Sequence, residues 1–248
     1  MTTITIITGT TRGLGASMAE QLATSGQHLV TLSRKSSDAL ATIAAKHGTT
    51  LTQLNVDLGD ANAVTKAALT IKSLLAGHDR VRFIHNAGIV TPIDQAENLN
   101  DLAVINNAFQ VNITSAIYLT AQVLSASHAA KDRRIMLISS GAGRNASSGW
   151  GVYCATKAAM DRYAEAVKLD LGDRARITSM APGVIDTDMQ VTIRSTPKEA
   201  LPSLDRFLGF HQNKQLGSPD VAAKRILTAL ESDGYGSTTI DDIRQYPA

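Results

Sequence analysis

Short apolar runs alternate with longer amphipathic segments along nearly the whole chain. The runs are rich in residues that favour β-structure, and they predict strands. These strands are Thr3–Thr8, Leu29–Ser33, Thr50–Val56, Val81–Asn86, Arg134–Ser139, Arg176–Ala181 and one near Thr238–Ile240. The segments between the runs carry apolar residues at helical spacing. They predict helices near Leu14–Ser25, Ser37–His47, Ala61–Leu75, Leu99–His128, Val152–Leu171 and Pro219–Glu231.

This alternation of strands and helices predicts an α/β fold. The strands are almost continuously apolar, as expected for a parallel sheet whose two faces are both buried. We therefore expect a Rossmann-type doubly wound parallel sheet of about seven strands, with helices on both faces. No Pro/Ser-rich linker, repeat or low-complexity tract appears, so residues 1–248 are expected to form a single domain. Residues 186–217 break the rhythm and contain Pro197 and Pro202, which predicts an irregular substrate lid.

Composition and charge exclude several classes of protein. The 248 residues are 44% hydrophobic and 19% charged, which suits a globular protein with a sizeable core. The net charge is +2 and the aromatic content 4%, so we expect no nucleic-acid partner. Cys154 is the single cysteine, which excludes an intrachain disulfide and a cysteine-based metal cluster. The first residues lack the pattern of a signal peptide, and a cytoplasmic location is expected.

One stretch, Leu102 to Ala130, carries no charged residue and is long enough to span a membrane. Its amide side chains would be costly in lipid, so no membrane contact is expected. These side chains are Asn106, Asn107, Gln110, Asn112 and Gln122. We predict instead a helix buried on several sides, partly by a second subunit.

A glycine-rich turn joins the first predicted strand to the first helix in "ITGTTRGLG". Gly9, Gly13 and Gly15 permit positive φ and let the backbone approach a pyrophosphate. The helix N-terminus beyond them offers free N–H groups and partial positive charge. An ordinary strand-to-helix turn is the alternative, but three glycines favour a dinucleotide site that also includes Thr11, Arg12 and Leu14.

The end of the second strand indicates which dinucleotide binds. An NAD site usually places a carboxylate there for the ribose hydroxyl. This chain has Ser33, Arg34 and Lys35 instead, and its first carboxylate is Asp38. With Arg12 in the glycine loop, these cations favour the 2′-phosphate of NADP, unless they only decorate a solvated strand end. After the third strand, Asp57 and Leu58 are placed to contact adenine.

A tyrosine and a lysine stand one helical turn apart in "GWGVYCATKAAMD". Residues four apart share a helix face, so Tyr153 and Lys157 should converge. A nearby ammonium and an oxidised nicotinamide would lower the phenol pKa, as a general acid/base requires. Ser140 ends the fifth strand and could hold a carbonyl oxygen, while Asn112 could position a water next to Lys157. The alternatives are a chance tyrosine–lysine spacing, a turn-capping serine and an asparagine that satisfies a buried carbonyl.

Taken together, these motifs resemble the short-chain dehydrogenase/reductase family. "TGTTRGLG" is similar to its T-G-x-x-x-G-x-G, "HNAG" at 85–88 to its N-N-A-G, and "PG" at 182–183 to its sixth-strand turn. Ser140, Tyr153, Lys157 and Asn112 match its catalytic set. "APGVIDTDMQ", "GWGVYC" and "TTIDDIR" resemble the sepiapterin reductase branch, and "SGAGRN", "IRS" and "LDRF" resemble bacterial benzil reductases.

The resemblance implies roles for further residues. Near the cofactor it places Asn86, Ala87, Gly88, Pro182, Gly183, Ile185, Asp186, Thr187, Asp188 and Met189, with Thr187 on the nicotinamide carboxamide. Near the substrate it places Ser140, Gly141, Trp150, Tyr153, Gly183, Met189 and Asp241, the last of which matches the residue that anchors the pterin. It also implies a homo-oligomer, a dimer or tetramer whose face is the 102–130 and Val152–Leu171 helices.

The expected activity is NADPH-dependent reduction of a ketone or 1,2-diketone, such as benzil, to a hydroxyketone. The alternatives are reduction of a pterin side chain and a non-catalytic protein that senses NADP. Met189, Trp150, Leu204, Phe207 and Phe210 would form an apolar pocket, or Phe207 and Phe210 would only pack the lid onto the core.

Two residues depart from the family pattern. His85 replaces the first asparagine of N-N-A-G, where a neutral imidazole could substitute, and no accompanying cluster indicates a metal. Cys154 follows Tyr153 on a different helix face and is expected to be buried and inert.

Overall fold

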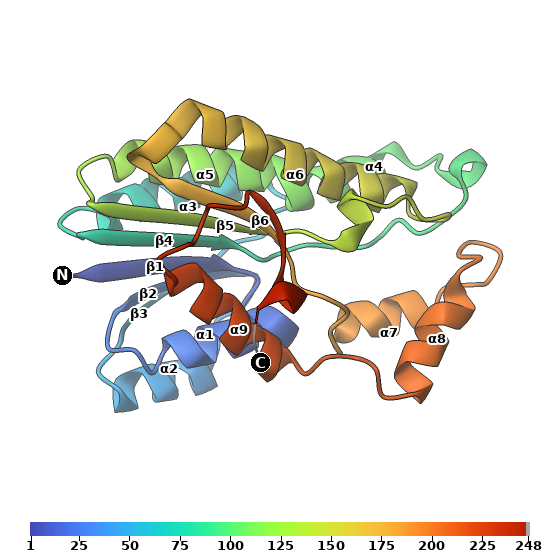
Figure 1. The fold of residues 1–248 in the computed structure, drawn as a ribbon, viewed down its shortest axis with the longest axis horizontal. Helices are drawn as coiled ribbons and strands as arrows, with labels where there is room; N and C mark the ends of the chain where they lie inside the picture. The colour runs from blue at the N-terminus through green and yellow to red at the C-terminus, as the bar shows by residue number, and fades with distance from the viewer. Residues whose placement is uncertain (247–248) are drawn as a thin grey trace.

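The strands form one parallel sheet in the computed structural model, which describes residues 1–246 (Figure 1). The strand order is β3-β2-β1-β4-β5-β6-β7, which confirms the predicted Rossmann-type fold. Each predicted strand lies within two residues of an observed one. The strands are β1 Thr3–Thr8, β2 His28–Ser33, β3 Thr50–Asn55, β4 Arg80–His85, β5 Asp132–Ile138, β6 Arg176–Ala181 and β7 Ile240–Asp242.

Helices cover both faces of this sheet (Figure 1). One face carries α3 Ala61–Leu74, α5 Ser115–Ala126 and α6 Gly151–Leu171, with α4 Leu102–Phe109 packed beside α6. The other face carries α1 Gly13–Leu22, α2 Asp38–Lys46 and α9 Pro219–Glu231. Beyond the carboxyl ends of the strands lie α7 Asp188–Arg194 and α8 Leu204–Gln212.

Two apolar cores hold these layers together. On one face, Ile6 and Phe83 of the sheet pack with Leu119 of α5. On the other, Ile7 and Ile84 pack with side chains of α1 and α9. Successive strand residues point to opposite faces, so strands buried on both sides carry apolar residues at consecutive positions, such as Ile6 and Ile7 of β1.

The predicted Leu99–His128 helix is wrong in detail. It is divided into α4 and α5 by a wider π-helical turn at Gln110–Thr114. Asp101 begins α4 by accepting hydrogen bonds from the N–H groups of Ala103 and Val104. The wider turn holds Asn112 fully buried, and π-turns of this kind are frequent at functional sites. Within residues 1–246, no helix is both long and apolar enough to cross a bilayer.

Residues 186–217, expected to be irregular, contain the two helices α7 and α8. Pro197 follows the end of α7 and Pro202 precedes the start of α8, so neither proline interrupts a helix. Ile193, Leu204 and Phe207 project apolar surface from these helices onto Trp150 at the start of α6. The segment, which we call the lid, is therefore ordered by packing onto the main body of the domain.

A partly buried charge cluster joins β4, β5 and β6 near their amino ends, away from the lid. Arg82, 1% exposed, donates to Asp132 at 2.7 Å and to Glu231 at 2.6 Å. Asp132 also accepts from Arg134 at 3.1 Å and from Arg176 at 2.9 Å. Burial raises the pKa of Asp132, but hydrogen bonds from Arg134 and Arg176, with the charge of Arg82, outweigh this and lower the pKa to about 2.

The lowered pKa predicts a pH-dependent stability. Because the folded pKa of Asp132 lies below its usual 3.8, its contribution is complete above that value and is lost as the pH falls through about 2. Asp132→Asn should therefore lower the free energy of unfolding by about 2 kcal/mol at neutral pH. Urea unfolding should show this difference shrinking toward zero near pH 2.

Asp205→Asn is the matched control, since Asp205 pairs with Lys198 on the exposed surface. It should change stability little at any pH. A deficit in Asp132→Asn that stays constant from neutral to acid pH would contradict the electrostatic explanation.

Candidate active site

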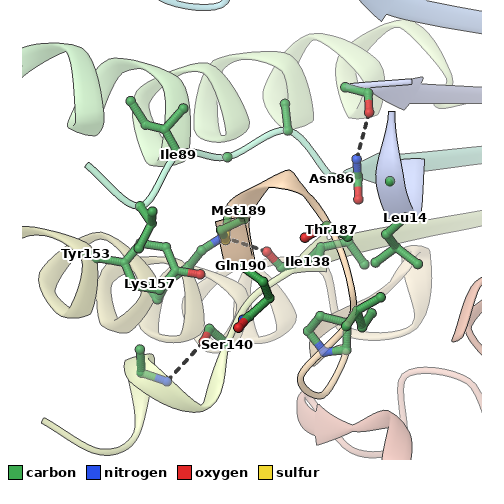
Figure 2. Close-up of a pocket in the computed structure, with 18 of the residues that line it drawn as sticks. Leu14, Asn86, Ile89, Ile138, Ser140, Tyr153, Lys157, Thr187, Met189 and Gln190 are labelled. Atoms are coloured by element: carbon green, nitrogen blue, oxygen red, sulfur yellow. Dashed lines mark hydrogen bonds between the residues drawn. The ribbon is translucent and has the colours of Figure 1, made fainter. Parts of the chain in front are cut away.

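A cavity of about 970 Å³ opens at the carboxyl ends of the strands (Figure 2). It is bordered by the glycine loop after β1, the loop after β4, the end of β5, the start of α6 and the lid. The strand order reverses between β1 and β4, which is where open α/β sheets bind ligands.

The glycine loop forms a cradle that larger residues would fill. Gly9 has φ +74°, and a Cβ there would lie 2.9 Å from Cα of Ala87. A Cβ on Gly15 would lie 2.0 Å from the carbonyl oxygen of Gly9. Asn86 donates from its Nδ2 to that same oxygen at 3.1 Å. The loop therefore packs tightly on the β4 end and leaves the N-terminus of α1 facing the cavity, as a pyrophosphate requires.

Most of the predicted cofactor residues line this cavity. They are Gly9, Thr11, Arg12, Gly13, Leu14, Gly15, Ser33, Arg34, Asp57, Leu58, Asn86, Ala87, Gly88, Tyr153, Lys157, Pro182, Gly183, Ile185, Thr187 and Met189. Of the described residues, Lys35 and Asp186 are also predicted near the cofactor but are not part of this lining. The lining thus runs from the β2 and β3 ends, past the glycine loop, to the lid.

The cations at the β2 end differ in their surroundings. Ser33 is buried, and its Oγ accepts a hydrogen bond from the Thr10 N–H at 2.7 Å, so its hydroxyl supports the glycine loop. Arg12 donates to Asp188 of the lid at 2.9 Å in an exposed ion pair. Arg34 borders the cavity at the same strand end. Arg34 is therefore the main cationic candidate for a phosphate, while Arg12 bridges the loop and the lid.

Ser140, Tyr153 and Lys157 meet at one end of the cavity (Figure 2). The Lys157 ammonium donates to the Ile138 carbonyl at 2.8 Å and lies 5.8 Å from the centre of the Tyr153 ring. Ser140 Oγ accepts from the Ala142 N–H at 3.2 Å. Tyr153 and Lys157 are both buried, at 6% and 3% exposure. Since α6 presents both toward the end of β5, the helical spacing brings together the predicted groups.

The protein alone does not produce the lowered tyrosine pKa that was expected. Burial raises the pKa of Tyr153 to about 12, and a hydrogen bond with Ser140 offsets this only in part. Burial also lowers the pKa of Lys157 to about 8, although Asp161 opposes the shift. The phenol therefore stays protonated at neutral pH, which suits a proton donor.

Asp161 is a neighbour of Lys157 that was not predicted. It lies one helical turn after Lys157, is 4% exposed and accepts from Ser179 Oγ at 2.6 Å. Its charge favours the ammonium form of Lys157. The same i, i+4 spacing that relates Tyr153 to Lys157 could have indicated it.

The side chain of Asn112 makes three hydrogen bonds within the protein. Its Oδ1 accepts from the Ile89 N–H at 2.8 Å, and its Nδ2 donates to the Ile89 carbonyl at 2.8 Å and to Thr156 Oγ1 at 3.1 Å. Asn112 is not among the described residues that line the cavity. Its side chain holds the loop after Gly88 against α6 and so satisfies buried backbone groups, which was the predicted alternative. The predicted water beside Lys157 stays a prediction.

His85 and Cys154 are the two departures from the family pattern. Burial, with a smaller effect from Lys157, lowers the pKa of His85 to about 3, so its imidazole is neutral. Its Nδ1 lies 3.5 Å from Thr8 Oγ1. Cys154 is half-buried, where full burial was expected. Within residues 1–246, no three His, Cys, Asp or Glu side chains are grouped to hold a metal ion.

The substrate end of the cavity is largely aromatic. The Trp150 ring lies 5.5 Å from Tyr153, edge to face, and 5.1 Å from Phe207. Phe207 lies 6.1 Å from Phe210. Phe207 both lines the cavity and packs the lid, so the two predicted roles coexist. Gly141, Gly183 and Met189, which are also predicted to lie near the substrate, line the same cavity.

Asp241 is directed elsewhere. It is 4% exposed, and its carboxylate accepts from the Tyr246 hydroxyl at 2.6 Å and from the Asp242 N–H at 2.7 Å. Among the described residues, Asp242 and Arg244 line the cavity and Asp241 does not. Adjacent strand residues point to opposite faces, which is why Asp242 borders the cavity while the Asp241 carboxylate is held by Tyr246. A contact between Asp241 and a substrate stays a prediction.

Comparison with known proteins identifies the family. A family model described as short chain dehydrogenase matches residues 3–198. This chain belongs to the short-chain dehydrogenase family. Among its relatives, a Bacillus cereus protein named benzil reductase ((S)-benzoin forming) is 34% identical over 93% of this chain and 94% of its own. The sepiapterin reductase of Rattus norvegicus is 30% identical over 94% and 93%.

A solved short-chain dehydrogenase/reductase from Burkholderia vietnamiensis is 34% identical, with a TM-score of 0.68 over 99% of this chain and 98% of that one. The family and these relatives make the chain an oxidoreductase that acts on carbonyl compounds with a nicotinamide dinucleotide. The cradle of glycines at the α1 N-terminus fits that cofactor.

Proposed function

We propose that this short-chain dehydrogenase is an NADPH-dependent reductase of ketones and 1,2-diketones such as benzil. The observation that carries the proposal is the meeting of Ser140, Tyr153 and Lys157 beside the glycine cradle, at the aromatic end of one cavity. A carbonyl substrate is also favoured by the relatives, which are named benzil reductase and sepiapterin reductase.

Each polar group then has a defined task. A bound nicotinamide supplies the hydride for the carbonyl carbon. Tyr153 gives its phenolic proton to the carbonyl oxygen, so the C=O bond becomes a CH–OH group. Ser140 Oγ donates a hydrogen bond to the same oxygen, and the nearby Lys157 ammonium stabilises the phenolate that the proton leaves behind. Solvent returns a proton to Tyr153 after each turnover.

Arg34 supports NADP over NAD. It borders the cavity at the β2 end, where an NAD site usually presents a carboxylate. Ser33 Oγ is occupied by Thr10, and Lys35 lies outside the lining among the described residues. We therefore assign the 2′-phosphate chiefly to Arg34, with Arg12 able to join it by leaving Asp188.

A pterin side-chain reductase is the second candidate, favoured only by the sepiapterin reductase relatives. The bonds that Asp241 makes to Tyr246 and Asp242 weigh against its anchoring a pterin. A non-catalytic NADP sensor is the third, and the complete Ser140, Tyr153 and Lys157 set weighs against it.

The test is direct. The purified protein is mixed with NADPH and, separately, with benzil, a simple ketone or sepiapterin, and the loss of NADPH absorbance is followed. Turnover of benzil supports the proposal, and turnover of sepiapterin alone favours the pterin reductase. Tight NADPH binding without turnover of any of them would favour the sensor.

We further propose that residues 1–248 act as one domain with 186–217 as the substrate lid. We also propose a homo-oligomer, a dimer or tetramer whose face is the 102–130 and Val152–Leu171 helices, and the exposed apolar side chains Leu102, Ile117 and Leu169 support it. The cytoplasmic location also stays a prediction.

A further inference from the structure

Gln190 is the buried polar side chain of the lid that the proposed chemistry does not use. It lies on α7 and lines the cavity, although only 7% of it is exposed. Its Oε1 has no hydrogen-bond partner within residues 1–246. Figure 2 shows the end of its side chain directed toward Ser140.

The surroundings of Gln190 make this orientation unusual. Met189, Ile193, Trp150 and Phe207 line the same cavity and belong to one apolar cluster, so the amide is a polar group beside a mainly apolar wall. A buried amide without a partner is destabilising, and such groups in folded proteins usually have a ligand or an ordered water as partner. A ligand hydroxyl close to the reacting carbonyl could donate to Oε1, and a half-turn of the amide would place Nε2 in the same position, where it could donate to a ligand carbonyl.

We propose that Gln190 determines specificity by binding an oxygen on the carbon next to the reacting carbonyl. This inference rests on the proposed function and narrows its substrate class to vicinal dioxygen compounds, namely 1,2-diketones and α-hydroxyketones. A second carbonyl accepts from Nε2 of Gln190, and a hydroxyl in that place donates to Oε1. Ser140 and Tyr153 hold the first oxygen, so the two oxygens of one substrate are bound from opposite sides of the cavity.

Two-point binding would select both the substrate and its orientation. A ketone without the second oxygen leaves the Gln190 amide unpaired, and a site built to bind a polar group discriminates against ligands that lack it. The reaction itself is unchanged: one hydride reaches carbon and one proton reaches oxygen. Gln190 acts only on which carbonyl is presented to Tyr153.

The experiment compares two activated ketones. Phenylpropanedione carries the second oxygen, whereas trifluoroacetophenone is activated by fluorine and lacks it. Replacing Gln190 by Met keeps the length of the side chain and removes the amide. In Gln190→Met, kcat/KM for phenylpropanedione should fall about tenfold and that for trifluoroacetophenone by less than about twofold, with the dissociation constant for NADPH unchanged.

Two further variants test whether the effect comes from the amide donor of residue 190. Gln190→Glu keeps the shape but removes the donor, so it should also lose activity on phenylpropanedione selectively. Gln212→Met makes the same exchange at the exposed end of α8 and should change neither ketone. An equal loss on both ketones, an unchanged ratio, or weaker NADPH binding in Gln190→Met would each overturn the inference while the proposed function stands. A wild-type protein that reduces neither ketone nor benzil would overturn both.

Discussion

Replacing Tyr153 by Phe should reduce kcat by about 10²–10⁴-fold and leave NADPH affinity nearly unchanged, because only the proton donor is lost. The phenyl ring would still pack against Trp150, whose ring lies 5.5 Å away, so the cavity should keep its shape. The buried phenol, with its pKa raised to about 12, is protonated at neutral pH before each turnover. Steady-state reduction of benzil and fluorescence titration with NADPH measure the two effects separately.

Tyr163→Phe is the matched control for this prediction. Tyr163 lies on the same helix, and its hydroxyl donates to the Ile117 carbonyl at 3.4 Å, away from the cavity lining. That variant should keep wild-type turnover. If Tyr153→Phe retained comparable activity, the role assigned to the phenol would be wrong.

Changing Arg34 to Asp should reverse the choice of cofactor. A charge-assisted hydrogen bond to the 2′-phosphate contributes enough that its loss should weaken NADPH binding about 10- to 100-fold. NADH has no phosphate at that position, and a carboxylate there can bind its ribose hydroxyls, so its KM should stay the same or fall. The ratio of kcat/KM for NADPH and NADH is the quantity to measure.

Lys46→Asp makes the same change of charge on the exposed surface of α2, away from the cavity lining. It separates a local contact of Arg34 from a general effect of net charge. The two variants should differ most at low ionic strength, where exposed charges are least screened. A wild-type preference for NADH, or an unaltered cofactor ratio in Arg34→Asp, would argue against NADP.

Local physical rules were enough to predict the sheet and the places where chemistry is possible. Strands buried on both faces place apolar side chains at consecutive positions, so the apolar stretches of β1, β4 and β5 are visible in the sequence. The turn at Gly9 has a positive φ and a close neighbour in Ala87, which only glycine accommodates. The spacing of Tyr153 and Lys157 follows from the period of a single helix.

The lid shows where such local rules ended. Pro197 and Pro202 predict irregular chain, yet they lie between the helices α7 and α8. The short α7 and α8 gain much of their stability from packing, here of Ile193 and Phe207 against Trp150. The sequence of residues 186–217 alone does not indicate the packing onto Trp150, which lies outside the segment.

What the sequence by itself determined is the fold, the dinucleotide cradle and the identity of the polar groups near it. What only the tertiary structure decided is which of those groups are free to act. The side chains of Asn112 and Ser33 bond to Ile89 and Thr10, and that of Asp241 to Tyr246. Gln190 instead faces the cavity with an oxygen that has no partner among residues 1–246. A polar side chain in the interior takes the nearest partner, and partners distant in sequence come together only when the chain folds.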